Sequence, residues 1–300
     1  MSLINSFFIS TISILPKWIA KPFATPYVAG ETEDEVAKHI KSLNNKGMSA
    51  TVDILGEHTL SKKIAREITT QYSNLYKRIH KDALDCNISV KPTHIGLDIS
   101  IEEAKKNFYS LVEIAKKYSN FLRIDMENSK VTDKTLEIYK YCKANYSKVG
   151  IVTQAYLYRS NKDIDNLSNT DFNSRICKGI YNESSSIAIK ENNLINENYI
   201  KLAKTMYKNG SYSGFATHDQ TLIDNLLNWI KKYNIPKNCF EFQVLYGVPM
   251  EGRLESLIDK GYKVRVYVPY GKDWFDYSLR RLKENPDIAR YILKNIFRKK

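Results

Sequence analysis

The sequence predicts an α/β fold, a (β/α)8 barrel of the TIM type with extra N-terminal helices. From residue 48 onward, short apolar runs rich in β-branched residues alternate with longer amphipathic stretches, and this alternation implies parallel strands joined by helical crossovers. About eight such units fit into the 300 residues, a usual length for one closed barrel. An open doubly wound sheet is the alternative, although no G-x-G-x-x-G motif follows the first expected strand.

The expected strands are short, as is usual in parallel sheets. They cover Ser49–Leu55, Ile88–Lys91, Phe121–Glu127, Val149–Leu157, Ser174–Tyr181, Gly214–Asp219, Phe240–Leu245 and Lys263–Val268. The segment 161–172 is polar and weakly periodic, so we expect a loop there. Residues 1–47 are expected to form an N-terminal helical segment that packs on the barrel of residues 48–300.

The stretches between the strands have the spacing of amphipathic helices, in which apolar residues three or four apart share one face. A helix is also expected over Thr32–Asn44, and Ser100 with Glu103 matches a capping box. The apolar stripes are Ala104, Phe108, Leu111, Ala115 and Tyr118 in one stretch, Tyr199, Leu202 and Met206 in a second, and Leu222, Leu226, Trp229 and Ile230 in a third.

The chain is basic, with a net charge of +13 and a pI near 9.3. Such a balance indicates contact with something anionic, whether nucleic acid, a membrane surface or an acidic ligand, and does not choose among them. The lysines are scattered through the expected helices, so a solvated basic surface is the plainer interpretation.

Several classes of protein are disfavoured. The four cysteines form no C-x-x-C pair and the five histidines no H-E-x-x-H motif, so we expect reduced thiols in a cytoplasmic protein and no metal site. The apolar N-terminus lacks a basic flank and is interrupted by Pro16, which argues against a signal peptide or a spanning helix. An amphipathic helix that covers the core, or touches a bilayer, is expected instead.

Polar and charged residues gather where the expected strands end. In a barrel the carboxyl ends of the strands carry the active site. A single charged residue there is usually only solvated, but a recurrence on every strand predicts a site. The residues include Asp53, Lys91, Arg123, Asp125, Gln154, Arg175, Lys178, Thr217, His218, Glu241, Gln243, Arg265 and Tyr267, with Arg280 and Arg281 further on.

At these strand ends the sequence resembles the proline dehydrogenase family. The matching segments occur in the family's order between about residues 27 and 286. They are Tyr27-Val-Ala-Gly-Glu31, Ser89-Val-Lys-Pro-Thr93, Arg123-Ile-Asp-Met-Glu-Asn128, Val152-Thr-Gln-Ala-Tyr156, Arg175-Ile-Cys-Lys-Gly-Ile-Tyr181, Phe215-Ala-Thr-His218, Phe240-Glu-Phe-Gln-Val-Leu-Tyr-Gly247 and Tyr277-Ser-Leu-Arg-Arg-Leu-Lys-Glu-Asn285. The resemblance implies a distorted barrel that binds FAD, oxidises L-proline to Δ1-pyrroline-5-carboxylate and passes electrons to a membrane quinone, with peripheral membrane contact as a further expectation.

The resemblance also implies roles for individual residues. Asp125 and Arg175 would act in catalysis, and Arg280 and Arg281 would bind the substrate carboxylate, which guanidinium groups suit better than ammonium groups do. The other expected substrate contacts are Lys91, Tyr181, Tyr267, Tyr277 and Glu284. The expected FAD contacts are Met126, Gln154, Arg175, Lys178, Gly179, Ile180, Thr217 and His218.

One position departs from the family pattern, and two other functions stay open. Asp219 stands where the family often has Asn, and its carboxylate would repel a pyrophosphate unless it pairs with a cation or points away. The alternatives are another flavin barrel of the methylenetetrahydrofolate reductase type and a non-enzymatic basic protein that binds nucleic acid. The Arg280–Arg281 pair argues against the first, and the absence of a stripe of basic and aromatic residues argues against the second.

Overall fold

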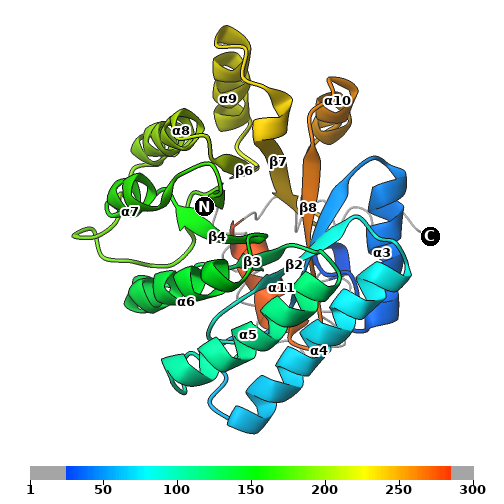
Figure 1. Ribbon diagram of the computed structural model, residues 1–300. Coiled ribbons are helices and arrows are strands. Elements are labelled where there is room, and N and C mark those ends of the chain that lie inside the picture. The colour runs from blue at the N-terminus through cyan, green and yellow to red at the C-terminus, as the bar shows by residue number, and fades with distance from the viewer. Residues whose placement is uncertain (1–24, 285–300) are drawn as a thin grey trace.

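The computed structural model describes residues 25–284 and shows a closed barrel of eight parallel strands (Figure 1). Strands adjacent in sequence are adjacent in the barrel, and the first strand closes it by pairing with the eighth. The predicted (β/α)8 barrel is therefore confirmed, whereas residues 1–24, which hold most of the apolar N-terminus, lie outside the described residues. The strands are β1 (Ser49–Ile54), β2 (Cys86–Val90), β3 (Leu122–Ile124), β4 (Val149–Gln154), β5 (Asn173–Cys177), β6 (Tyr212–Ala216), β7 (Phe240–Leu245) and β8 (Val264–Tyr270).

Helices surround the strands and bury the apolar stripes that the sequence predicts. The predicted stripe residues are buried in the helices Ile101–Lys117, Asn192–Lys208 and Gln220–Lys232. The exception is Tyr118, which is half-buried at the end of the first of these helices. The surrounding helices are α3 (Glu33–Asn45), α4 (Lys62–Lys81), α5 (Ile101–Lys117), α6 (Thr132–Asn145), α7 (Ser160–Leu167), α8 (Asn192–Lys208), α9 (Gln220–Lys232) and α10 (Arg253–Asp259).

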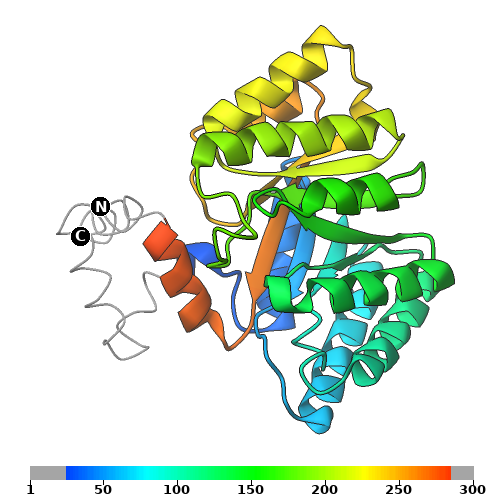
Figure 2. The ribbon, with the colours of Figure 1, turned by 90° about the vertical axis from the view of Figure 1, so that its left-hand side faces the viewer.

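The barrel is distorted at its closing point. Helix α3, which is capped reciprocally by Thr32 and Glu35, packs against β1 and β8 and takes the place on the outside that the helix after β8 would normally fill. The helix after β8, α11 (Trp274–Glu284), instead lies across the carboxyl end of the barrel (Figures 1 and 2). The last helix therefore brings its residues over the strand ends.

Most strands end earlier than predicted. β3 ends at Ile124, β5 at Cys177 and β6 at Ala216. Asp125, Lys178 and Thr217, which were expected on these strands, therefore lie in the loops that directly follow them. At Gly179 the backbone has φ = +117°, and a Cβ atom there would lie 2.2 Å from the ring of Tyr156. That left-handed conformation and close approach explain why strand geometry cannot continue there.

Two local expectations were wrong. Ser100 accepts a hydrogen bond from the Glu103 backbone, as a capping box requires, but the Glu103 side chain is bound by Arg66 Nε at 2.9 Å instead of returning to the cap. The expected loop over 161–172 contains α7 (Ser160–Leu167), whose apolar periodicity is weak because it is short and buries one large apolar side chain, Ile164.

Candidate active site at the carboxyl ends of the strands

The centre of the site is a carboxylate that four strands surround. Asp125 directly follows β3, and its Oδ1 accepts hydrogen bonds from Arg175 Nη1 on β5 at 2.8 Å and from Ser89 Oγ on β2 at 2.5 Å. Its Oδ2 lies 3.0 Å from the hydroxyl of Tyr267 on β8. Asp125 and Arg175 are each less than a tenth exposed, so this ion pair is shielded from solvent and its geometry is well constrained.

A second carboxylate shares the same tyrosine. Asp53 on β1 accepts a hydrogen bond on Oδ2 from the Tyr267 hydroxyl at 2.7 Å and from Lys91 Nζ at 2.5 Å. Its Oδ1 accepts from the Tyr72 hydroxyl at 3.0 Å. Asp53 is completely buried, and Lys91 directly follows β2. The phenol of Tyr267 therefore lies between the two carboxylates, Asp53 and Asp125.

The two carboxylates differ in their electrostatic surroundings. Burial raises the pKa of Asp53, and Lys91 only partly offsets this effect. Burial also acts on Asp125, but Arg175 and Lys91 outweigh it and hold the pKa of that carboxyl below its usual value. Burial opposes the charge on Lys91, yet Asp53 and Asp125 raise the pKa of its ammonium group. Asp125 is thus a stable anion and Lys91 a stable cation at neutral pH.

Two arginines of the site pack against tyrosine rings, one on β5 and one on the covering helix α11. The Arg175 guanidinium lies over the Tyr267 ring, 5.0 Å from its centroid, a cation–π contact. On α11, Arg281 is buried and lies 5.4 Å from the centroid of Tyr277. Burial and the positive charge of Arg281 lower the pKa of His218 to about 4, so that imidazole is neutral and accepts a hydrogen bond on Nε2 from the Leu245 backbone at 2.9 Å.

The polar residues at the ends of β4, β5 and β6 fit a flavin nucleotide. The Gln154 side chain donates to the backbone carbonyl oxygens of Met126 and Glu127 at 3.1 and 2.9 Å. Its buried Oε1 has no hydrogen-bond partner among residues 25–284, which suits a ring N–H or a hydroxyl donor. Thr217 is buried after β6, and Lys178 supplies a half-buried cation after β5. These groups are compatible with a ligand that carries both a hydrogen-bond donor and an anionic group, as a flavin nucleotide does.

Asp219 is paired with a cation and caps a helix. Its Oδ2 accepts hydrogen bonds from Lys178 Nζ at 2.5 Å and from Asn196 Nδ2 at 3.0 Å, while its Oδ1 caps α9 by accepting from the Leu222 backbone at 3.0 Å. Burial opposes ionisation, but these hydrogen bonds lower the pKa of Asp219 to about 2. The carboxylate therefore pairs with a cation, which is one of the two arrangements expected to reduce its repulsion of a pyrophosphate.

The structure brings most of the predicted residues to one end of the barrel. Asp125 is hydrogen-bonded to Arg175 and to Tyr267, and Lys91 joins the same network because it and Tyr267 both bind Asp53. Gly179 and the exposed Ile180 lie in the loop after β5. Tyr181, in that same loop, and Tyr277 are half-buried. The predicted Arg280 and Glu284 fall on α11, but their side chains lie outside the described residues.

Three residues of this network had no individual role assigned from the sequence. Asp53 and Gln243 were only among the polar residues expected at the strand ends, and Ser89 was not singled out. All three are buried polar residues within strands. A charge or amide inside an apolar run is costly to bury without partners, and this cost was the signal that could have identified them. Strand alternation alone does not tell which of them point toward the barrel axis and which toward the helices.

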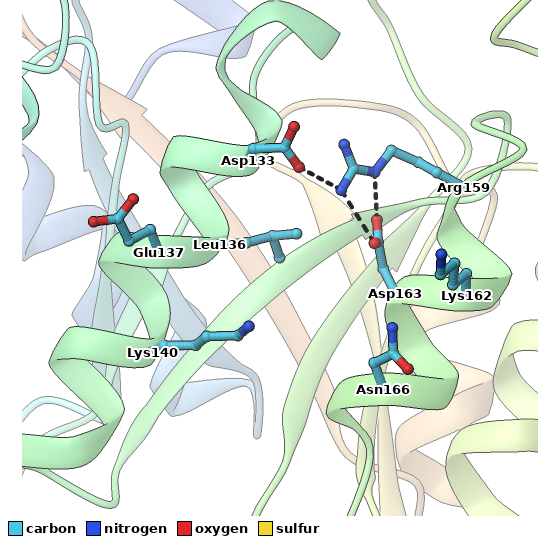
Figure 3. A pocket seen from close by; sticks show the side chains of 8 residues that line it. All are labelled: Asp133, Leu136, Glu137, Lys140, Arg159, Lys162, Asp163 and Asn166. Carbon is cyan, nitrogen blue, oxygen red and sulfur yellow. Dashed lines mark hydrogen bonds and ion pairs between the residues drawn. The ribbon is translucent and has the colours of Figure 1, made fainter.

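A separate pocket of about 510 Å³ lies between α6 and α7, on the outer side of the barrel (Figure 3). At its rim Arg159 forms ion pairs with Asp133 and Asp163 at 2.7 Å each. The lining holds three cations (Lys140, Arg159 and Lys162) and three carboxylates (Asp133, Glu137 and Asp163), so its formal charges balance. None of the residues that line the pocket belongs to the network around Asp125. The pocket therefore offers no comparable arrangement of reactive groups.

The closed barrel, with charged and phenolic side chains gathered at the carboxyl ends of its strands, defines the chain as a barrel of the enzyme type. The sequence profile of one family, described as proline dehydrogenase, matches residues 36–292. The chain belongs to the proline dehydrogenase family.

Individual relatives agree with this assignment. The chain is 39% identical over 276 residues to proline dehydrogenase 1 of Bacillus subtilis subsp. natto, covering 92% of this chain and 91% of the relative. It is 31% identical to proline dehydrogenase of Deinococcus radiodurans, covering 92% and 90% of the two chains. Among solved structures, proline utilization A (PutA) from Bdellovibrio bacteriovorus inactivated by N-propargylglycine superimposes with a TM-score of 0.82 at 29% identity. That match covers 90% of this chain and 33% of the PutA chain, so the present chain spans about a third of that longer protein.

Proposed function

We propose that the chain oxidises L-proline to Δ1-pyrroline-5-carboxylate with FAD as cofactor, and that the electrons then pass to a membrane quinone. The observation that carries this proposal is the hydrogen-bonded network of Lys91, Asp125, Arg175 and Tyr267, covered by the helix that bears the buried Arg281, in a member of this family.

The substrate's carboxylate would be bound by cations. Arg281 on α11 and Lys91 after β2 are the described candidates, with Arg280 as the second guanidinium of the pair. Fork-shaped guanidinium groups bind a planar carboxylate in two hydrogen bonds. Glu284 would hold these arginines in place, and Tyr181 and Tyr277 would line the same pocket.

Tyr267 is suited to fix the position of the proline ring. Its hydroxyl is bound between Asp53 and Asp125 at 2.7 and 3.0 Å, and the Arg175 guanidinium packs on its ring. An aromatic ring held in this way provides a flat, rigid surface, and rigid positioning contributes much of the rate of such reactions. Asp125 would act by holding Arg175 and Tyr267 in the catalytic arrangement.

The cofactor would bind beside this pocket. When bound, FAD would accept a hydride from the ring carbon next to the proline nitrogen. Arg175 and Gln154 would lie near the reactive edge of the flavin, where a cation favours the electron-rich reduced form. The remaining contacts would come from residues after three of the strands: Met126, Lys178, Gly179, Ile180, Thr217 and His218. His218 would contribute as a neutral group, since its pKa is lowered to about 4 by burial and Arg281.

The proposal is tested by the absorption spectrum of the purified protein. We expect a flavin spectrum, release of FAD rather than FMN on denaturation, and bleaching of the flavin band when L-proline is added without oxygen. D-proline serves as the control and should leave the band intact. A colourless protein, or a flavin band that L-proline does not bleach, would contradict the proposal. Treatment with N-propargylglycine, the compound named for the Bdellovibrio structure, should abolish subsequent bleaching.

Electron transfer to a quinone in the membrane suggests contact with lipid. The net charge of +13 favours an anionic surface. No helix within residues 25–284 is long and apolar enough to cross a membrane. Flotation with anionic liposomes tests the contact: we expect binding at low salt that weakens at high salt. Absence of binding at both salt concentrations would reject it.

A further inference from the structure

A chain of buried polar groups continues from Arg175 away from the strand ends. Arg175 Nε donates to Gln243 Oε1 on β7 at 2.7 Å, and Gln243 Nε2 donates to Glu241 Oε1 at 2.6 Å. The same Glu241 oxygen accepts from Arg265 Nε on β8 at 2.7 Å. Gln243 and Glu241 are each 3% exposed. A buried amide is thus enclosed between a guanidinium and an ion-paired carboxylate.

The carboxylate of Glu241 fixes the orientation of the Gln243 amide. Burial acts to raise the pKa of Glu241, but Arg265 outweighs it and keeps the carboxyl ionised. An ionised carboxylate only accepts hydrogen bonds, so the NH2 group of Gln243 must face Glu241. The amide oxygen then faces Arg175, where it accepts from Nε and leaves Nη1 to bind Asp125 and Ser89.

A glycine makes this contact possible. Arg175 is on β5 and Gln243 on β7, and the two side chains meet across the intervening β6. In β6, Gly214 pairs with Arg175 on one side and Glu241 on the other. A Cβ atom at position 214 would lie 2.4 Å from Gln243 Nε2 and 3.0 Å from its Cδ. Any larger residue there would displace the amide.

We propose that Gln243 is a positioning residue, which orients the Arg175 guanidinium toward Asp125 and the strand ends, with the Glu241–Arg265 ion pair fixing the amide and Gly214 leaving it room. Gln243 touches neither substrate nor cofactor in this account. It acts through Arg175, so the kinetic part of its test rests on the proposed function, whereas the spectroscopic part does not.

The decisive variant is Gln243→Glu. A protonated carboxylic acid can supply the one donor and the one acceptor that the amide uses here, whereas the ionised form has no donor to offer Glu241. We therefore expect kcat/KM for Gln243→Glu, relative to the wild-type protein at the same pH, to recover as the pH falls. Gln243→Met cannot replace either hydrogen bond, so it should lose roughly 10- to 100-fold in kcat/KM, as expected for one charge-assisted hydrogen bond, with a ratio to wild type that does not change with pH.

A second readout requires no activity. The Nε–H resonance of Arg175, assigned by its loss in Arg175→Lys, should exchange slowly with solvent in the wild-type protein and at least tenfold faster in Gln243→Met and Gly214→Ala, because the acceptor is removed or displaced. Asn107→Leu is the control: it removes a buried amide on α5 that donates to the Ile95 carbonyl oxygen. It should lower stability without altering the Arg175 resonance or the pH dependence.

The proposal is overturned if Gln243→Glu and Gln243→Met show the same activity ratio at every pH, or if the Arg175 resonance exchanges equally fast in the wild-type protein and Gln243→Met. If the wild-type protein does not oxidise proline, the proposed function fails and the exchange measurement still decides the role of Gln243.

Discussion

Replacing Lys91 with methionine should destabilise the protein in a manner that depends on pH. Lys91 Nζ is 2.5 Å from Asp53 Oδ2, and the side chains of these residues are 16% and 1% exposed. The methionine keeps most of the aliphatic stem and removes only the ammonium group. Asp53 would then be a buried carboxylate whose remaining partners are the hydroxyls of Tyr72 and Tyr267.

The expected loss is large because the pair is buried. Removing one member of a buried ion pair costs about 3–5 kcal/mol, whereas an exposed pair contributes about 1 kcal/mol or less. Lys105→Met is the matched control: Lys105 Nζ also lies 2.5 Å from a carboxylate, that of Glu137, but those side chains are 28% and 56% exposed. We expect a change of about 1 kcal/mol or less for this control.

The sign of the pH dependence follows from Asp53. Burial already raises the pKa of this carboxyl above its ordinary value, and loss of Lys91 raises it further. Below the unfolded-state pKa of about 4, Asp53 is protonated in both the folded and the unfolded protein, and the folded state has its full stability. As the pH rises from there toward the folded-state pKa, the unfolded state ionises first, and the free energy of unfolding falls. The deficit of Lys91→Met should therefore grow between pH 5 and pH 7, by at most about 1.4 kcal/mol per pH unit.

Urea unfolding of both variants and the wild-type protein at pH 5, 6 and 7 measures these differences. The double variant Lys91→Met with Asp53→Asn should recover part of the loss at pH 7, because the buried charge is gone. Equal losses for Lys91→Met and Lys105→Met, or a loss for Lys91→Met that is the same at all three pH values, would refute the reasoning.

Three further predictions concern the site and its loops. Arg281→Met should raise the KM for proline at least tenfold, as expected for a lost charged hydrogen bond, while the FAD content of the purified protein stays near that of wild type; an unchanged KM would refute the assignment. Gly179→Ala should lower the free energy of unfolding by about 1–3 kcal/mol, because φ is +117° and the new Cβ would lie 2.2 Å from the Tyr156 ring. Thermal or urea unfolding measures this change, and an unchanged midpoint would count against the prediction. Asp219→Ala should cost about 0.5–2 kcal/mol by loss of the cap on α9, and Asp219→Asn, which can still cap the helix, should cost less but lose the pairing with Lys178.

The fold followed from the sequence to a large extent. Alternation of apolar runs and amphipathic stripes predicted all eight strands, because burial on both faces leaves a strong pattern in a parallel sheet. The weak points were elements with little apolar burial. Helix α7 (Ser160–Leu167) was expected to be loop, since Ile164 is its one large buried apolar residue. The position of α11 at the barrel end was implied by the family resemblance, which assigned Arg280 and Arg281 to the substrate carboxylate. Its amphipathic pattern alone did not predict this position, because it suits packing on the outside equally well.

The site was predicted in part. Lys91, Asp125, Arg175 and Tyr267 follow or belong to four different strands, and the rule that barrel sites lie at the carboxyl ends of strands indicated that they would meet. The partners that hold them could not be found in this way. The contact between Arg175 and Gln243 spans an intervening strand, and it depends on the register and on the direction of each side chain, which sequence periodicity does not provide.

The most direct test of the site is a crystal structure of the FAD-loaded protein with cyclopentanecarboxylate, which keeps the five-membered ring and the carboxylate of proline but lacks the nitrogen. We expect the carboxylate of this compound to lie within ion-pair distance of Arg281 and Lys91, with its ring against Tyr267. A compound bound elsewhere, such as in the pocket between α6 and α7, or an Arg281 guanidinium directed away from it, would contradict the account.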